Sequence, residues 1–168
     1  MIGRAELEAM LTVESVRGLQ ILQLSLGVGV VLFCGAIVFF WWSGEPVESA
    51  PPGVVPMLTL AQFAVAVASF AVSAPLFRSR LGAVRNAGSP EEGLEALRGA
   101  WMLRVAIPEG AALFGAAVAF LAVMNRVVDA HPLYWINLAT PAVFVLFVAR
   151  TFPTRDGLME LLRDRLTG

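Results

Sequence analysis

Four long apolar stretches constrain this chain more than any other feature of its sequence. They lie at about residues 19–42, 56–77, 103–124 and 133–149, and the first contains no charged residue. A helix needs about 20 apolar residues to cross a hydrocarbon core of roughly 30 Å. Helices satisfy their own backbone hydrogen bonds in lipid, and the short alternating strands of a membrane barrel are absent from the sequence. Because 58% of the residues are hydrophobic and 15% are charged, lipid is the expected solvent, and the sequence predicts an all-α fold, a membrane four-helix bundle.

The arginines predict the orientation of these spans. All 12 lysine and arginine positions are arginines, and every one except Arg126 falls before the first span, between the second span and the first residues of the third, or after the fourth. The positive-inside rule places that side in the cytoplasm, so we expect both termini there. Trp41, Trp42 and Trp135 lie at the opposite ends of their spans, where amphipathic rings prefer the interface. We therefore predict a multi-pass protein of the cell inner (cytoplasmic) membrane in contact with the lipid bilayer.

Segments outside the spans predict amphipathic helices at both ends of the chain. Residues 1–18 place apolar and acidic residues on opposite faces of a helix. The tail after Arg150 contains GLMELLRDRL, whose leucines form an apolar stripe, and we expect this helix to lie on the cytoplasmic membrane surface. The proline-rich segment 43–55 is predicted to be a short external loop.

The sequence between the second and third spans contains the start of a helix. Residues 86–88 form a turn sequence, and Ser89 follows as an N-cap. Pro90 takes the first helical position, and Glu92 completes a capping box. We therefore expect a third helix over about 90–124, which begins outside the membrane.

The chain contains an internal repeat. Residues 16–39 align without gaps to residues 97–120, and 8 of the 24 aligned positions are identical. The repeat predicts a single membrane domain made of two tandem transmembrane hairpins, residues 1–80 and 81–168. The two hairpins would run in parallel and be related by an axis along the membrane normal.

Glu109 is the one acidic residue inside a predicted span. A charged side chain at the centre of a membrane helix costs about 2.5–3.5 kcal/mol, so such a residue is by default a candidate functional site. From their levels in the membrane, Gln62, Ser69 and Gln23 are the expected hydrogen-bonding neighbours of its carboxyl group. This combination can build a proton or sodium site. In the alternatives, Glu109 is hydrated near the inner headgroups, or it forms an interhelical hydrogen bond without ion transport.

Small residues are frequent in the spans around Glu109. Gly110 and Gly115 on the third span, and Ala64 and Ala68 on the second, are the expected positions of close helix packing. Such surfaces favour a homo-oligomer or a complex with partner membrane proteins.

Residues 61–124 resemble the proteolipid, or subunit c, of rotary ATP synthases. AVAVASFAVSA stands where that family has its small-residue helix, residues 86–91 stand at its polar loop, and LRGAWMLRVAIPEGAALFGAAVAFL matches its second helix. By this resemblance Glu109 would be the ion carrier, neutralised by a proton when it faces lipid. The whole chain also looks like small bacterial four-span membrane proteins that have no assigned function.

Motifs of enzymes and of nucleic-acid-binding proteins are absent from the sequence. It has no Walker loop, no Rossmann glycine pattern, no HExxH and no cysteine–histidine cluster for a metal. Nor does it have a basic stripe with interleaved aromatic residues. We therefore expect a protein that is not an enzyme, holds no cofactor and binds no nucleic acid. Two functions remain: a proteolipid-like protein with a proton or sodium ion at Glu109, or a structural, accessory or assembly subunit of a larger membrane complex.

Overall fold

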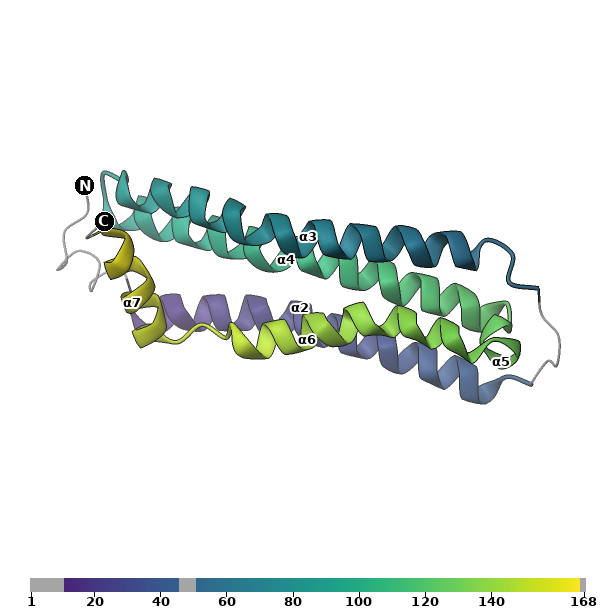
Figure 1. Cartoon of the computed structure of the whole chain (residues 1–168). Helices are drawn as coiled ribbons and strands as arrows, with labels where there is room; N and C mark the ends of the chain where they lie inside the picture. Colours follow the sequence, from purple (N-terminus) through teal and green to yellow (C-terminus); the bar gives the residue numbers. More distant parts are fainter. Residues whose placement is uncertain (1–10, 46–50, 167–168) are drawn as a thin grey trace.

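The computed structural model describes residues 11–45 and 51–166 of the chain. Every regular element in these residues is a helix, and no strand occurs among them. Figure 1 shows long helices running side by side along one axis, which confirms the predicted all-α bundle. In chain order the elements are α2 (Val13–Ser43), α3 (Val55–Arg85), α4 (Pro90–Met124), α5 (Val127–Ala130), the 3-10 helix η1 (Pro132–Leu138), α6 (Ala139–Arg150) and α7 (Arg155–Leu166).

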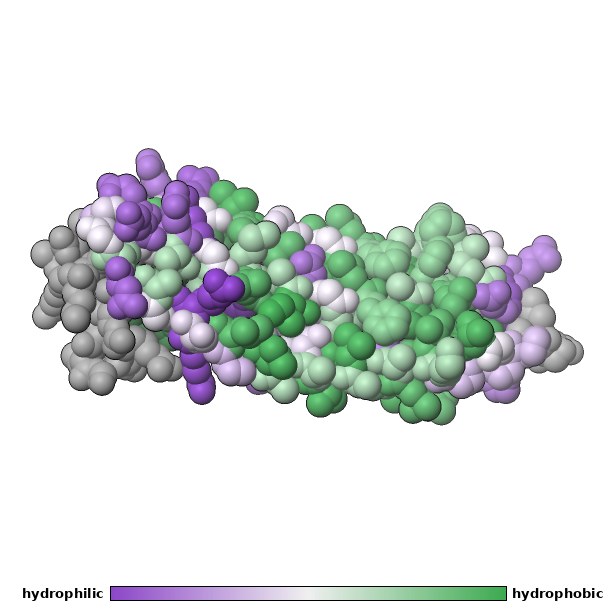
Figure 2. Space-filling model, turned by 90° about the horizontal axis from the view of Figure 1, so that it is seen from above, coloured by the Kyte–Doolittle hydropathy of each residue, from purple (hydrophilic) through white to green (hydrophobic). Residues whose placement is uncertain are grey.

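Within the described residues, four segments are long and apolar enough to cross a membrane: α2, Val55–Val84 of α3, α4, and Pro132–Arg150, which joins η1 to α6. Figure 2 shows apolar residues along the middle of the bundle and hydrophilic residues at its two ends. A bilayer-spanning protein has this distribution. The chain is therefore an integral, multi-pass membrane protein, while the orientation of its two ends stays a prediction from the arginines.

The central helix of the bundle is α4. It makes its most extensive contact with α3 and also packs against α2, η1 and α6. By contrast, α2 hardly touches α3, the next helix in the chain. Figure 1 shows this arrangement, with α3 beside α4 and α2 beside α6. The sequence predicts that α2 and α3 form the first hairpin. They are consecutive in the chain, but each of them packs mainly on other helices.

Small side chains let the other helices approach α4 closely. Its second half buries a series of alanine and glycine residues, Ala111, Ala112, Gly115, Ala116, Ala119 and Ala122. Lipid tails are as apolar as the side chains of the helices, so helix association in a membrane depends on close packing of this kind. The central place of α4 therefore follows from its composition.

The start of α4 is fixed by the capping box that the sequence predicts. Ser89 Oγ accepts a hydrogen bond from the N–H of Glu92 at 3.3 Å, and Glu92 Oε2 accepts one from the N–H of Gly88 at 2.9 Å. Two backbone N–H groups at the entry of the helix are thereby satisfied. The predicted helix is confirmed, because α4 begins at Pro90 and ends at Met124.

The fourth span is short, with 19 residues from Pro132 to Arg150. Its first part is the 3-10 helix η1. A 3-10 helix rises about 2.0 Å per residue, against about 1.5 Å for an α-helix. The span therefore reaches about 32 Å, enough to cross a hydrocarbon core of roughly 30 Å.

Both ends of the described chain meet at one end of the bundle (Figure 1). Arg155 Nε donates a hydrogen bond to the Leu11 carbonyl at 3.1 Å, and Gln20 Nε2 donates one to the Pro153 carbonyl at 2.9 Å. The predicted C-terminal helix is present as α7. Its apolar residues such as Leu158 are buried in the same core cluster as Leu11, and its expected place on the membrane surface stays a prediction.

The first span begins at Val13 and is capped by Thr12, whose Oγ1 accepts a hydrogen bond from the N–H of Ser15 at 3.1 Å. The amphipathic helix predicted over residues 1–18 falls largely on residues 1–10, which lie outside the described part of the chain. The helix described at this end is therefore the start of the first span.

Replacing Ser89 by alanine removes the cap of α4 and should loosen its first turn. Loss of an N-cap costs about 1 kcal/mol, which corresponds to roughly fivefold faster amide exchange where the helix end frays. We expect this increase in peptides that contain Glu92, measured by hydrogen-exchange mass spectrometry in detergent. The control is Ser79→Ala, on the exposed side of α3. Equal exchange in the two variants would show that Ser89 does not hold the helix end.

Candidate functional site

Glu109 lies in the membrane-spanning part of α4, at the border between its packed and its exposed surface. Val105 and Ala112, each about one turn away, are fully buried, whereas Met102 and Leu113 are exposed. Glu109 itself is half-buried. Its side chain is therefore at the rim of the bundle.

The carboxyl group of Glu109 makes no hydrogen bond or ion pair with the described residues. Arg104, on the same helix, is engaged elsewhere. Its guanidinium carbon lies 4.6 Å from the ring centroid of Phe77 and 5.0 Å from that of Trp101. Glu109 thus has no counter-ion in the part of the chain that the structure describes.

Gln23, expected near Glu109, instead joins α2 to α4 and to the end of α6 from a fully buried position. Its Nε2 donates hydrogen bonds to the Val148 carbonyl at 2.6 Å and to Thr151 Oγ1 at 3.3 Å. Its Oε1 accepts a hydrogen bond from Trp101 Nε1 at 2.9 Å. Both polar atoms of the amide are satisfied, as burial in an apolar interior requires. Gln23 is therefore a structural link between helices and not a neighbour that binds Glu109.

Gln62 also bonds away from Glu109, in a buried polar cluster between α3 and the fourth span. Its Oε1 accepts a hydrogen bond from Thr140 Oγ1 at 3.0 Å. A second pair joins the same two segments, because Asn137 Nδ2 donates to Thr59 Oγ1 at 3.1 Å. Gln62 and Asn137 are both fully buried. The cluster was missed by sequence reasoning, although an asparagine and a threonine inside an apolar span are a signal for it.

Gly115 of α4 packs directly on this polar cluster. A Cβ atom at this position would lie 2.8 Å from the Asn137 carbonyl oxygen and 2.9 Å from Gln62 Oε1, closer than Cβ atoms come in real structures. Pro141, four residues after Asn137, has no N–H, so the α-helical hydrogen bond from residue i+4 to that carbonyl cannot form. Because residue 115 is a glycine, the space that a side chain would fill is occupied by this carbonyl and by the Gln62 amide.

The other predicted packing residues lie on the outside of the bundle. Gly110, Ala64 and Ala68 are exposed, and no atom of a neighbouring helix lies within 4 Å of the place of a Cβ on Gly110. Ser69 is half-buried and makes no hydrogen bond with the described residues. The residues expected around Glu109 are therefore not gathered there, and the small ones form a surface open to lipid or to another helix.

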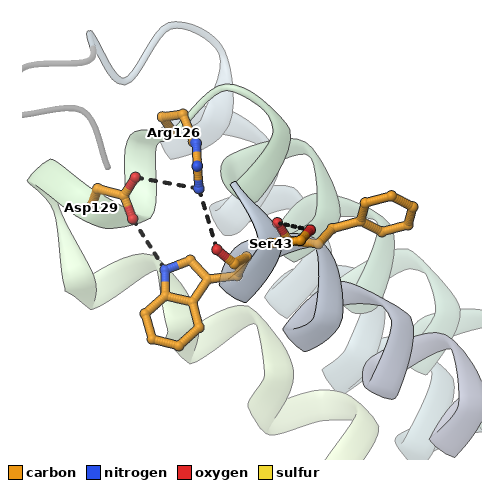
Figure 3. A network of polar contacts seen from close by, with 5 residues as sticks. Ser43, Arg126 and Asp129 are labelled. Carbon is orange, nitrogen blue, oxygen red and sulfur yellow. Dashed lines mark hydrogen bonds and ion pairs between the residues drawn. The ribbon is translucent and has the colours of Figure 1, made fainter. Parts of the chain in front are cut away.

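A polar network that sequence reasoning missed joins helix ends at the end of the bundle opposite α7 (Figure 3). Arg126 Nη1 lies 3.6 Å from Asp129 Oδ2 and donates a hydrogen bond to the Trp41 carbonyl at 3.4 Å. Trp41 Nε1 donates in turn to Asp129 Oδ1 at 3.1 Å. The network ties the end of α2 to the corner between α4 and α5. Its signal in the sequence is Arg126, the single arginine on its side of the predicted membrane.

Comparison with protein-family models, with curated proteins and with solved structures finds no match for this chain. The resemblance of residues 61–124 to proteolipid subunits stays a prediction. The function is therefore inferred from the geometry of the chain itself.

Gly115→Ala should destabilise the bundle, because the new methyl group must displace the Asn137 carbonyl or the Gln62 amide. Overpacking of a rigid site costs about 1–3 kcal/mol. We expect a lower midpoint of thermal unfolding, measured by circular dichroism in detergent. Gly110→Ala is the matched control, since it faces open space and should leave the midpoint unchanged or raise it. Equal midpoints for the two variants would contradict the close packing of Gly115.

Proposed function

We propose that this protein is a proteolipid-like membrane subunit, not an enzyme, in which the carboxyl group of Glu109 binds and releases a proton. The observation that carries the proposal is the position of Glu109, half-buried at the rim of α4 and without a partner in the described chain. A charged side chain within a membrane helix costs about 2.5–3.5 kcal/mol. A bound proton removes this charge while Glu109 faces lipid. Release of the proton requires water or a cation from outside the described chain.

A proton suits this position better than a sodium ion. Sodium sites in membrane proteins surround the ion with several oxygen ligands, such as unwound backbone carbonyls. Two of the expected ligands, Gln62 and Gln23, have their side-chain oxygens bonded to other residues. A proton needs only the carboxyl oxygen that it binds, so we infer a proton as the ion.

The depth of Glu109 would give the proton a short route to water. Arg104 lies five residues earlier on α4, which is about 7.5 Å along the helix axis. Its guanidinium stacks on Trp101, a residue type that prefers the membrane interface. Glu109 would therefore lie about one and a half turns inside one face of the bilayer.

A structural or accessory role in a larger membrane complex is the second candidate, and the outer surface of α3 favours it. Most of the packing of α3 is against α4, and Ala64 and Ala68 are exposed on it. Small residues allow a partner helix to approach closely. In this role Glu109 would donate a hydrogen bond to that partner and would not release its proton.

A lipid-soluble carbodiimide should label Glu109 in the folded protein, because this reagent reacts with protonated carboxyl groups inside membranes. We expect the labelling, located by mass spectrometry, to fall as the pH rises and to be insensitive to sodium. Glu160, exposed on α7, is an internal control that should stay unlabelled. Absence of label on Glu109 at mildly acidic pH would contradict the proposal, and protection by sodium would identify sodium as the ion instead.

Glu109→Gln distinguishes the two candidate functions, because glutamine keeps the size of the side chain but cannot exchange a proton. If Glu109 carries a proton, the variant should lose one infrared carboxyl band that changes with pH, and its migration on a blue-native gel should not change. An accessory subunit should show no such pH-dependent band. Gly110→Leu, on the exposed surface, should then alter the gel migration by blocking a partner helix.

A further inference from the structure

A second site lies beside the Arg126 network, away from Glu109. A cavity of about 560 Å³ opens there, between the end of α2, the corner of α4 and α5, and η1. Its lining includes Trp41, Trp42 and Trp135 together with Arg126 and Asp129. This volume is within the range of about 300–1,000 Å³ that small-molecule sites in proteins have.

The cavity is lined by one positive and one negative side chain, which face each other as an ion pair. The side chains of Arg126 and Asp129 are 17% and 13% exposed. Asp129 Oδ2 is buried and accepts no hydrogen bond within the described chain. The Arg126 guanidinium has several N–H donors, and its hydrogen bond to Trp41 uses Nη1. An anion can therefore bind at Arg126, and a cation in the cavity is attracted by the negative charge of Asp129, whose Oδ2 faces Arg126 at 3.6 Å.

The position of the Arg126 guanidinium is fixed by its surroundings. It lies against Gly44, at the place where a Cβ atom would be. The backbone of Arg126 is left-handed, with φ at 58°, a conformation that costs a non-glycine residue about 1–2 kcal/mol. Figure 3 shows the side chain directed across the corner toward the end of α2, where Ser43 lies. The charge is thus held in place before any ligand binds.

Tryptophan rings supply a surface for a cation next to Asp129. Trp41 and Trp135 meet edge to face with ring centroids 5.4 Å apart, and Trp42 is 83% exposed. A cation over the face of a tryptophan gains roughly 0.5–2 kcal/mol. Aromatic walls beside a carboxylate oxygen are therefore suited to an ammonium group.

The cavity lies at the level where the spans meet the lipid headgroups. Here α2 ends at Ser43, α4 ends at Met124 and the fourth span begins at Pro132. We propose that the cavity binds the headgroup of a zwitterionic aminophospholipid, phosphatidylethanolamine. Its phosphate would bind Arg126, and its ammonium group would lie on the indole rings, attracted by the charge of Asp129. This inference goes beyond the function proposed for Glu109 and does not depend on it.

Native mass spectrometry of the full chain, in micelles with equal amounts of phosphatidylethanolamine and phosphatidylglycerol, tests this inference. The two lipids share the phosphate, and only the first has an ammonium group. We expect phosphatidylethanolamine to be retained about fivefold more often, which corresponds to a cation–indole contact of about 1 kcal/mol. Asp129→Asn should lower this preference, because it removes the negative charge beside the indole rings.

Asp129 also accepts a hydrogen bond from Trp41, so Asp129→Asn could disturb the fold as well as the cavity. A second variant that leaves this hydrogen bond in place is therefore needed. Trp42 makes no hydrogen bond with the described residues, so Trp42→Ala leaves the network intact and should lower the preference. The matched control is Asp156→Asn at the other end of the bundle, which should keep it. Equal retention of the two lipids by the unaltered protein would overturn the proposal. A preference that survives both Asp129→Asn and Trp42→Ala would overturn it as well.

Discussion

The hydrophobic effect does not drive apolar helices to associate in lipid, because lipid chains are as apolar as leucine side chains. The bundle described here depends on α4, the helix that the other described spans pack against. Its alanine and glycine residues let these spans approach closely, and at Gly115 the approach leaves no room for a methyl group. The places of α2, α3 and the fourth span are thus set by how each meets α4.

Hydrogen bonds of buried amide side chains determine which faces of the helices meet in this packing. Gln23 links α2 to Trp101 of α4 and to α6, and Gln62 links α3 to Thr140 of α6. Hydrogen bonds between membrane helices are worth about 0.6–2 kcal/mol each. These amides face the inside of the bundle, whereas Glu109 lies at its rim and has no partner in the described chain. The contacts that hold the helices together therefore leave the membrane carboxyl group available to lipid or to a partner.

Features that depend on neighbouring residues could be predicted from the sequence. Ser89, Pro90 and Glu92 lie within one turn, and they locate the start of α4 at the correct residue. The spans could be located because hydropathy reports directly on the solvent around a helix. These predictions need no knowledge of how one helix is placed against another.

The neighbours of Gln62 could not be predicted, because the level of a residue along a helix does not give the rotation of that helix about its axis. Gln62 turns toward Thr140 on the fourth span and bonds there instead of at Glu109. The network around Arg126 depends on a left-handed residue that brings Asp129 to Trp41, far away in the sequence. Both sites need the tertiary arrangement of three or more elements before their residues can be seen as a group.

The position of Glu109 at the rim of α4 can be measured directly by spin labelling of single copies in lipid nanodiscs. Labels placed one at a time along α4, in a cysteine-free background, report collisions with oxygen, which concentrates in lipid. We predict frequent collisions at Met102 and Leu113, rare ones at Val105 and Ala112, and an intermediate rate at Glu109. A rate at Glu109 as low as at Val105 and Ala112 would contradict this arrangement, because the carboxyl group would then be enclosed within the chain.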